Sequence, residues 1–191
     1  MGIIVPIFVC GQILSAFFFG GIFMKKNVRF LTHAAIIAAL YAVLTHLQNI
    51  ILMGSASFIS QCRLSEALCI LAFFTPAAIP GLSIGCLVFN LTFAGSLPLD
   101  WLIGTLATLL AAMGMWYTRR VTVKGYPLLG LLMPAITNAV LVGWELSVYI
   151  GGAFGLNAVS VAWGELLVMF TLGSVLYYAL KARNLHIRLF H

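Results

Sequence analysis

Arg63 and Glu66 are two charged residues that lie three positions apart at the start of an apolar segment. A carboxylate inside a membrane core costs roughly 2.5–3.5 kcal/mol on insertion scales, so one that is retained usually has a function. Glu66 is therefore the first candidate for ligand binding. A structural ion pair with Arg63 is the alternative, and the sequence leaves both roles open.

Other carboxylates and amides also lie in apolar segments. Asn138 and Glu145 are seven positions apart, about two helical turns, so both side chains project from nearly one helix face. Several carboxylates cannot all be paired with Arg63, so we expect some of them to meet a ligand, water or a proton. The predicted result is a polar, acidic cup that contains Glu66, Asn90, Asn138, Glu145 and Glu165.

Asp100 and four aromatic residues each allow two interpretations. Asp100 begins a predicted helix, where a carboxylate suits the helix dipole, so a capping role is favoured over ligand contact. Aromatic side chains in the cup would provide a stacking surface, but near a membrane interface they more often form a belt. The aromatic candidates are Trp144, Trp163, Phe89 and Tyr149.

No motif indicates catalysis or a bound cofactor. The sequence lacks a Gly-x-x-x-x-Gly-Lys phosphate loop, a His/Glu/His zinc spacing and a Gly-x-Ser-x-Gly nucleophile motif. The four cysteines lack the paired spacing of a metal site, and inert apolar packing is favoured for them. We therefore predict a protein that is not an enzyme, with no metal and no cofactor.

The composition indicates an integral membrane protein. Of the 191 residues, 63% are hydrophobic and 7% are charged, and the mean hydropathy is +1.13, whereas about a quarter of the residues in a soluble domain are charged. A bilayer-spanning helix needs about 20 apolar residues, which allows roughly six or seven spans. The sequence thus predicts one all-α domain, a polytopic six-helix transmembrane bundle in residues 24–191.

The predicted spans alternate with short polar or proline-containing turns. Pro76 and Pro80 end one helix and begin the next. Residues 1–23 form an extra hydrophobic segment, either an additional helix or sequence that precedes a translation start at Met24, and both interpretations stay open. The predicted helices are residues 31–53, 63–75, a third that follows the two prolines and runs to about 94, then 100–117, 127–150 and 158–180.

Ala34, Ala38 and Ala42 recur every four residues on one face of the first predicted span. Small residues at this spacing let a second helix approach closely in a membrane. That second helix can belong to the same bundle or to a partner subunit. The sequence alone does not separate packing from partner docking.

The basic residues predict the topology. Nine of the ten lie in three groups, before the first span, after the fourth and after the sixth. Six spans place these groups on one side, which the positive-inside rule assigns to the cytoplasm. Lys25 and the C-terminus are therefore expected to be cytoplasmic, and the net charge of +6 indicates topology rather than nucleic-acid binding. The groups are Lys25, Lys26 and Arg29; Arg119, Arg120 and Lys124; and Lys181, Arg183 and Arg188.

Six ordered sequence blocks resemble the QueT family of membrane substrate-binding subunits (S components) of energy-coupling factor, or ECF, vitamin transporters. The resemblance covers about residues 24–191, and residues 1–23 lie outside it. The blocks are Arg-Leu-Ser-Glu-Ala-Leu (63–68), Phe-Phe-Thr-Pro-Ala-Ala-Ile-Pro-Gly-Leu (73–82), Ile-Gly-Cys-x-x-x-Asn (84–90), Pro-Leu-Asp-x-x-x-Gly-Thr-Leu-Ala-Thr-Leu (98–109), Asn-Ala-x-x-Val-Gly-x-Glu-Leu (138–146) and Gly-Glu-Leu (164–166).

The resemblance implies a fold, a ligand and partners. It implies a six-helix S component of the bacterial plasma membrane that captures a queuosine precursor, a 7-deazaguanine such as preQ1, from outside. It also implies a transmembrane T subunit, docked on the alanine face of the first helix, and two cytoplasmic ATPases. With this ligand, one of Glu145 and Glu66 would accept hydrogen bonds from its N–H edge, and the other would neutralise its aminomethyl cation. The resemblance does not say which glutamate has which role. Asn90 and Asn138 would meet the ring's polar atoms, and Trp163 or Trp144 would stack on it.

Two other function classes remain open at this point. A stand-alone proton-coupled carrier, or an exporter of a small cationic or heteroaromatic solute, would use Glu145 or Glu165 as its proton site. Such carriers often contain internal repeats, and no convincing repeat relates the two halves of this sequence. A membrane scaffold without transport activity would leave the acidic cup unexplained.

Overall fold

The computed structural model describes residues 24–51, 63–93, 96, 99–123 and 125–182. The chain divides into two compact units, residues 1–32 and 33–191. In the first unit only the beginning of a helix is described, so both interpretations of residues 1–23 lie outside the described residues. The second unit holds nearly all of the described helical residues.

The described residues are helical apart from short connections, and an isolated bridge between Val123 and Tyr126 is their one β-type pairing. This arrangement agrees with the all-α prediction. The last three elements follow one another without a break, as one helix with a π-helical turn inside it. The elements are α2 (Met24–Ile51), η2 (Leu64–Phe73), α3 (Ala78–Thr92), α4 (Asp100–Thr118), α5 (Leu128–Tyr149), α6 (Phe154–Val168), η3 (Met169–Gly173) and α7 (Ser174–Ala182).

Four described segments are long and apolar enough to cross a membrane. The two helices that contain Glu66 and Asn90, η2 and α3, are shorter than these four segments. Pro76 accounts for the break, since the residue before a proline is disfavoured in the helical region and Pro80 fits in the first turn of α3. The four candidate spans are Val28–Ile51, Asp100–Thr118, Leu128–Tyr149 and Phe154–Ala182.

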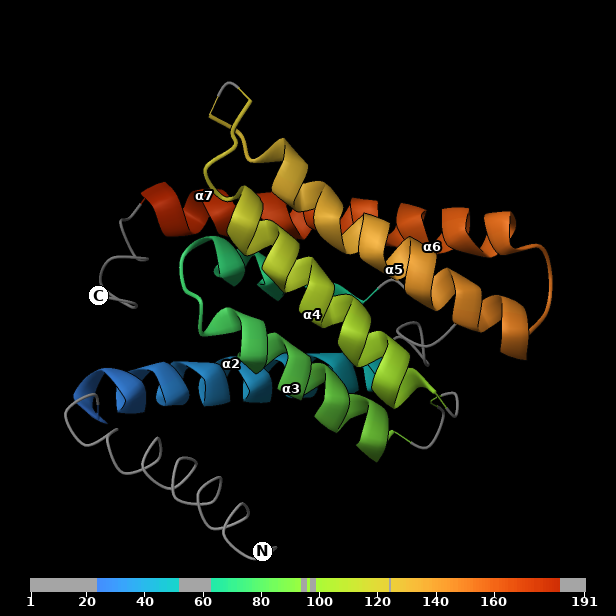
Figure 1. The fold of residues 1–191 in the computed structure, drawn as a ribbon, viewed down its shortest axis with the longest axis horizontal. Coiled ribbons are helices and arrows are strands. Elements are labelled where there is room, and N and C mark those ends of the chain that lie inside the picture. The colour runs from blue at the N-terminus through green and yellow to red at the C-terminus, as the bar shows by residue number, and fades with distance from the viewer. Residues whose placement is uncertain (1–23, 52–62, 94–95, 97–98, 124, 183–191) are drawn as a thin grey trace, which may run out of the picture. The chain divides into compact units, whose positions relative to one another are not determined.

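In the second unit, the helices that carry the predicted polar residues are packed side by side. α4 lies between α3 and α5, and α5 packs along α6 (Figure 1). The short η2 packs against α4 and η3. Carboxylates on η2, α4, α5 and α6 therefore come from neighbouring elements.

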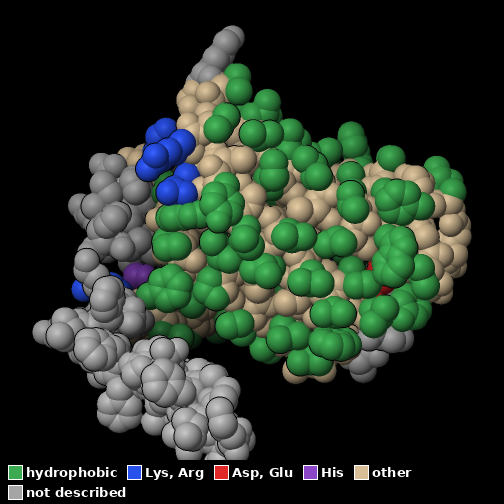
Figure 2. All heavy atoms as spheres, in the orientation of Figure 1, with side chains coloured by type: hydrophobic (Ala, Val, Ile, Leu, Met, Phe, Trp, Pro, Cys, Tyr) green, Lys and Arg blue, Asp and Glu red, His purple; other side chains and the backbone are tan. Residues whose placement is uncertain are grey.

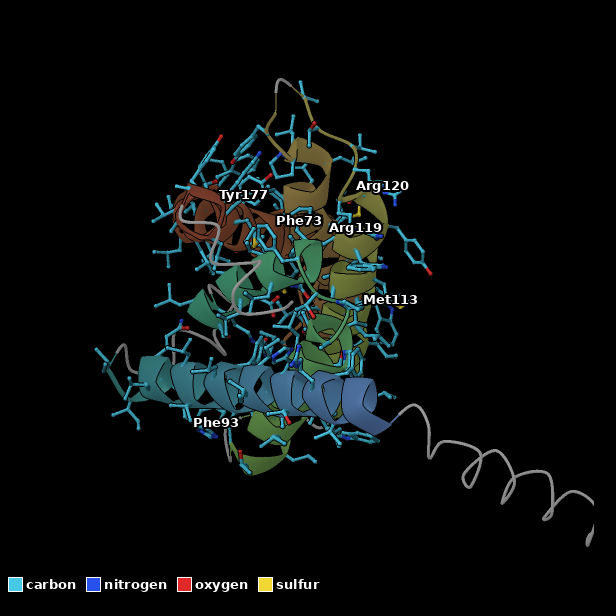
Figure 3. All side chains as sticks on the ribbon, turned by 90° about the vertical axis from the view of Figure 1, so that its left-hand side faces the viewer. Phe73, Phe93, Met113, Arg119, Arg120 and Tyr177 are labelled. Carbon is cyan, nitrogen blue, oxygen red and sulfur yellow. The ribbon has the colours of Figure 1, made fainter. Side chains whose placement is uncertain are left out.

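η2 is buried along most of its length, and this explains how a ten-residue helix fits a membrane bundle. Cys69, Ile70 and Ala72 are fully buried in the larger hydrophobic core. At its end, the rings of Phe73 and Tyr177 meet edge to face with centroids 5.8 Å apart (Figure 3). Neighbouring helices enclose η2, so its first turn carries Glu66 into the interior.

Hydrophobic side chains cover the face shown in Figure 2, and acidic side chains are almost hidden from it. Arg119 and Arg120 lie together at the end of α4 (Figure 3). An apolar exterior around buried charges suits lipid contact, the reverse of a soluble protein's charge distribution. The chain is therefore a membrane protein in composition and in structure.

The alanine face of α2 is a packing face. Ala34, Ala38 and Ala42 are buried, and a Cβ added at Gly85 would come within 2.7 Å of the Ala38 carbonyl oxygen. A Cβ at Gly81 would lie 2.8 Å from the Ala34 carbonyl oxygen. Alanines on one helix and glycines on the other thus bring two backbones together. The close approach at Ala34 and Ala38 fits the packing alternative, and docking of a partner subunit stays a prediction.

Candidate functional site

The interior of the second unit holds a cluster of charged side chains. Five of them, contributed by η2, α4, α5, α6 and the residue before η2, are each no more than 4% exposed. Asn90 and Asn138 are also buried. We call this group the acidic cluster; its charged members are Arg63, Glu66, Asp100, Glu145 and Glu165.

Electrostatic interactions connect the charged members. Arg63 interacts with Asp100 and Glu66, and Glu145 interacts with Asp100 and with Arg63. Glu165 interacts with Glu66 and with Arg63. The structure therefore brings together residues that the sequence places as many as a hundred positions apart. One guanidinium interacts with four carboxylates, among them the three glutamates of the predicted cup.

Glu66 is held by hydrogen bonds from three elements. The Tyr41 hydroxyl on α2 donates to Oε1 over 2.5 Å, and the Thr108 hydroxyl on α4 lies 3.4 Å from the same oxygen. The thiol of Cys69, one turn further along η2, donates to Oε2 over 3.1 Å. Both oxygens thus have protein donors, which fix the orientation of this carboxylate.

The polar side of α2 that holds η2 was missed by sequence reasoning. Besides Tyr41, the Thr45 hydroxyl donates to Ser65 Oγ over 2.7 Å. The Gln48 side-chain oxygen accepts a hydrogen bond of 2.7 Å from the backbone N–H of Leu64. Tyr41, Thr45 and Gln48 are four and three positions apart, the spacing of one helix face. This spacing could have predicted the polar face from the sequence. The alanine repeat on the same helix is more conspicuous.

Asn90 connects α3 to the start of α4. Its amide nitrogen donates to the backbone carbonyl of Asp100 over 2.8 Å, whereas its side-chain oxygen has no hydrogen-bond partner. A Cβ added at Gly104 would lie 2.9 Å from this amide nitrogen and 3.6 Å from Arg63 Nη1. The absence of a side chain at Gly104 therefore lets α4 approach Asn90 and Arg63 closely.

α5 and α6 contribute the other two carboxylates. The Asn138 amide donates to Glu165 Oε1 over 3.0 Å. Glu165 Oε2 and both oxygens of Glu145 are buried and accept no hydrogen bond. Because buried polar atoms are nearly always paired, these acceptors, with the Asn90 oxygen, are the atoms most in need of a donor.

The tryptophans point away from the acidic cluster. Trp144 is 51% exposed and Trp163 is 65% exposed, so the favoured belt interpretation fits them better than stacking on a ligand in the cluster. Tyr149 is 41% exposed and fits the same interpretation. Phe89 is fully buried, and the guanidinium carbon of Arg63 lies 5.8 Å from its ring centroid. Phe89 is thus the aromatic candidate that meets the cluster.

Asp100 faces the cluster as well. It is the first residue of α4, after the N-cap residue Leu99, and no side-chain hydrogen bond caps the helix. Its carboxylate is buried and interacts with Arg63 and Glu145. Its position in the first turn of α4 agrees with the favourable interaction with the helix dipole, and its contacts with Arg63 and Glu145 keep it among the candidates for ligand contact.

A separate cavity of about 180 Å³ lies beside α2 and η2. Its lining residues include no carboxylate and no aromatic ring, so a polar heterocycle would find few partners there. The described part of the chain contains no group of three or more His, Cys, Asp or Glu side chains arranged to hold a metal. The lining residues are Leu44, Leu47, Gln48, Ile51 and Leu64.

The cluster can bind a donor-rich ligand. Its open side-chain oxygens accept hydrogen bonds, and its four carboxylates outnumber its single guanidinium. Arg63 is fixed between carboxylates and the Phe89 ring, so it orients the cluster. The arrangement is suited to the recognition of a ligand.

The comparisons with known proteins identify the family. No curated protein and no solved structure matches the chain. The family model described as QueT transporter matches residues 31–182, most of the chain. That range contains most of α2 and every member of the acidic cluster. The chain therefore belongs to the QueT transporter family, as its sequence blocks predict.

Proposed function

We propose that this membrane transporter chain is the substrate-capturing subunit of an ECF-type importer. In this proposal its ligand is a queuosine precursor, a 7-deazaguanine such as preQ1, taken up from outside the bacterial plasma membrane. The observation that carries the proposal is the set of buried, unpaired acceptors on Glu145, Glu165 and Asn90. A membrane interior retains such groups when they have a partner to bind.

The chemistry of a 7-deazaguanine complements these acceptors. Its Watson–Crick edge presents adjacent N–H donors, which a carboxylate accepts in pairs. Glu165 is already aligned by Asn138 and retains one open oxygen, and Glu145 retains two. The ring of Phe89, beside Arg63, provides an apolar surface at the cluster.

The proposed partners supply the energy. The sequence contains no phosphate loop, so a chain of this kind needs a T subunit and two cytoplasmic ATPases to drive uptake. Because Ala34 and Ala38 lie against Gly81 and Gly85 of α3, the proposal places T-subunit docking on another surface. The basic end of α4, with Arg119 and Arg120, is proposed to face the cytoplasm.

Isothermal titration of the purified chain with preQ1 tests the ligand. We expect saturable binding with one site per chain, and no binding of cytosine, which lacks the fused ring. An absence of binding to preQ1, to its 7-cyano analogue and to guanine would exclude the proposed ligand class. Co-purification of the tagged chain with a T subunit and ATPases tests the partners separately.

A proton-coupled carrier is the second candidate, because Glu66 and Glu165 interact in the interior and both are buried. Uptake of labelled preQ1 separates the two candidates. An importer driven by ATPases loses uptake when those subunits are deleted. A stand-alone carrier keeps uptake in that strain and loses it when a protonophore collapses the proton gradient.

A further inference from the structure

The geometry points to a division of labour within the acidic cluster. We propose that Glu145, beside Asp100, binds an alkylammonium group of the ligand, whereas Glu66 is a positioning residue that the ligand does not contact. This inference rests on the proposed function, in which the cluster binds the ligand. It assigns roles that the sequence leaves interchangeable between Glu145 and Glu66.

Hydrogen bonding separates the two glutamates. Tyr41 and Thr108 approach one oxygen of Glu66, and Cys69 donates to the other. Both oxygens of Glu145 are buried and accept no hydrogen bond. A ligand at Glu66 would have to displace donors that the protein already provides, whereas a ligand at Glu145 supplies donors that are missing.

The atoms around Glu145 determine what kind of ligand group fits. The unpaired side-chain atoms of Asn90, Glu145 and Glu165 in the cluster are all oxygens that accept hydrogen bonds. A primary ammonium has three donors and no acceptor. A nitrile or carbonyl group would place a further acceptor against these oxygens and leave them unpaired.

Charge favours the same assignment. Glu145 interacts with the carboxyl group of Asp100, and two carboxylates close together repel each other unless a cation offsets their charge. Arg63 is the one guanidinium or ammonium group among the described residues of the cluster, and it also interacts with Glu66 and Asp100. A ligand cation at Glu145 adds the positive charge that this side of the cluster lacks.

A comparison of two ligands with the same ring tests the assignment. The probes are 7-aminomethyl-7-deazaguanine, a cation, and 7-cyano-7-deazaguanine, which is neutral. Isothermal titration of the full chain is expected to show at least about tenfold tighter binding of the aminomethyl compound, and Glu145→Gln is expected to reduce this preference to about threefold or less. Glu66→Gln is expected to change the affinity for both compounds by the same factor and so to retain the preference.

Each outcome decides one question. The ammonium site would be overturned if the unmodified chain bound both compounds with equal affinity. It would also be overturned if Glu145→Gln weakened the binding of both compounds by the same factor. In either case the proposed ligand class would stand. A preference that disappears in Glu66→Gln but persists in Glu145→Gln would exchange the two roles. If Glu145→Gln does not fold, Asp100→Asn provides the same test with the same expected loss of preference. Binding of neither compound would overturn the proposed function and this assignment with it.

Discussion

The hydroxyl of Tyr41 donates a hydrogen bond of 2.5 Å to Glu66 Oε1, and both side chains are almost completely buried. The two residues are 25 positions apart, on α2 and η2. A short bond to a carboxylate is among the stronger hydrogen bonds in proteins. The bond thus holds the Glu66 side chain against α2. In the sequence, the alanine repeat of α2 is more conspicuous than Tyr41.

Tyr41→Phe should therefore destabilise the chain. The substitution removes the donor and leaves a buried carboxylate oxygen with only the longer contact to Thr108, 3.4 Å away. Hydrogen bonds to charged groups contribute about 1.5–3 kcal/mol, and we expect a loss of this size in the free energy of unfolding. Thermal unfolding in detergent measures it as a lower midpoint.

Tyr117→Phe is the matched control, because Tyr117 is 73% exposed on α4. The control should unfold at the temperature of the unmodified chain. Equal midpoints for both variants would show that the Tyr41 hydroxyl contributes little to stability. A Tyr41→Phe variant that is stable but binds ligand less tightly would instead assign Tyr41 to the ligand.

Long apolar helices were predictable from the sequence, and the short η2 was not. The predicted residues 100–117 and 127–150 agree with α4 (Asp100–Thr118) and α5 (Leu128–Tyr149) to within one residue at each end. Polar or proline-containing turns flank both helices, so local signals define their ends. The 3₁₀ form of η2 depends on packing against α4 and η3, and no local pattern specifies it.

The carboxylates of the acidic cluster were predictable because charge in an apolar segment is rare. The spacing of residues around a helix also predicts the direction in which a tryptophan side chain points relative to a neighbouring glutamate. Trp163 precedes Glu165 by two positions, about 200° around a helix, and Trp144 precedes Glu145 by one, about 100°. Because α6 buries Glu165, it must turn Trp163 outward.

Gly85→Ala should disrupt the packing of α2 on α3. The new Cβ would lie 2.7 Å from the Ala38 carbonyl oxygen and 2.8 Å from the Cβ of Tyr41. Neither atom is the end of a flexible side chain, so the helices must separate. We expect destabilisation of about 1–3 kcal/mol, as for overpacked interiors, measured by thermal unfolding.

Gly155→Ala is the control for this substitution. Gly155 is also helical, in α6, and an added Cβ there meets no atom within 4 Å. Alanine has a higher helix propensity than glycine, so this variant should be as stable as the unmodified chain or slightly more so. If Gly85→Ala unfolded at the same temperature as Gly155→Ala, the close packing of α2 on α3 would be contradicted.

The charge distribution makes a topological prediction. Arg120 at the end of α4 and Ala153 before α6 are both exposed, and α5 lies between them. An impermeant thiol reagent added to intact cells should modify Ala153→Cys and spare Arg120→Cys. The same topology predicts that Ser57 and Gly152 are extracellular, and Ser57 is not among the residues that the structure describes. Modification of position 120 alone would invert the orientation.

Gly104→Ala should weaken ligand binding without direct contact with the ligand. A Cβ at this position would come within 2.9 Å of Asn90 Nδ2, so Asn90 must move away from the Asp100 carbonyl that its amide binds over 2.8 Å. The loss of one such bond and of the aligned Asn90 oxygen corresponds to roughly 1–1.5 kcal/mol, or about five- to tenfold in affinity. Isothermal titration with preQ1 measures this change.

Gly114→Ala provides the comparison on the same helix. Its added Cβ would meet the side chain of Met133, at 2.8 Å from the sulfur, and a methionine side chain can change rotamer to make room. Its affinity for preQ1 should equal that of the unmodified chain. Asn90→Ala combined with Gly104→Ala should bind no more weakly than Asn90→Ala alone, because both act through one side chain. Additive losses would mean that Gly104 acts through Arg63, 3.6 Å from the same Cβ position, rather than through Asn90.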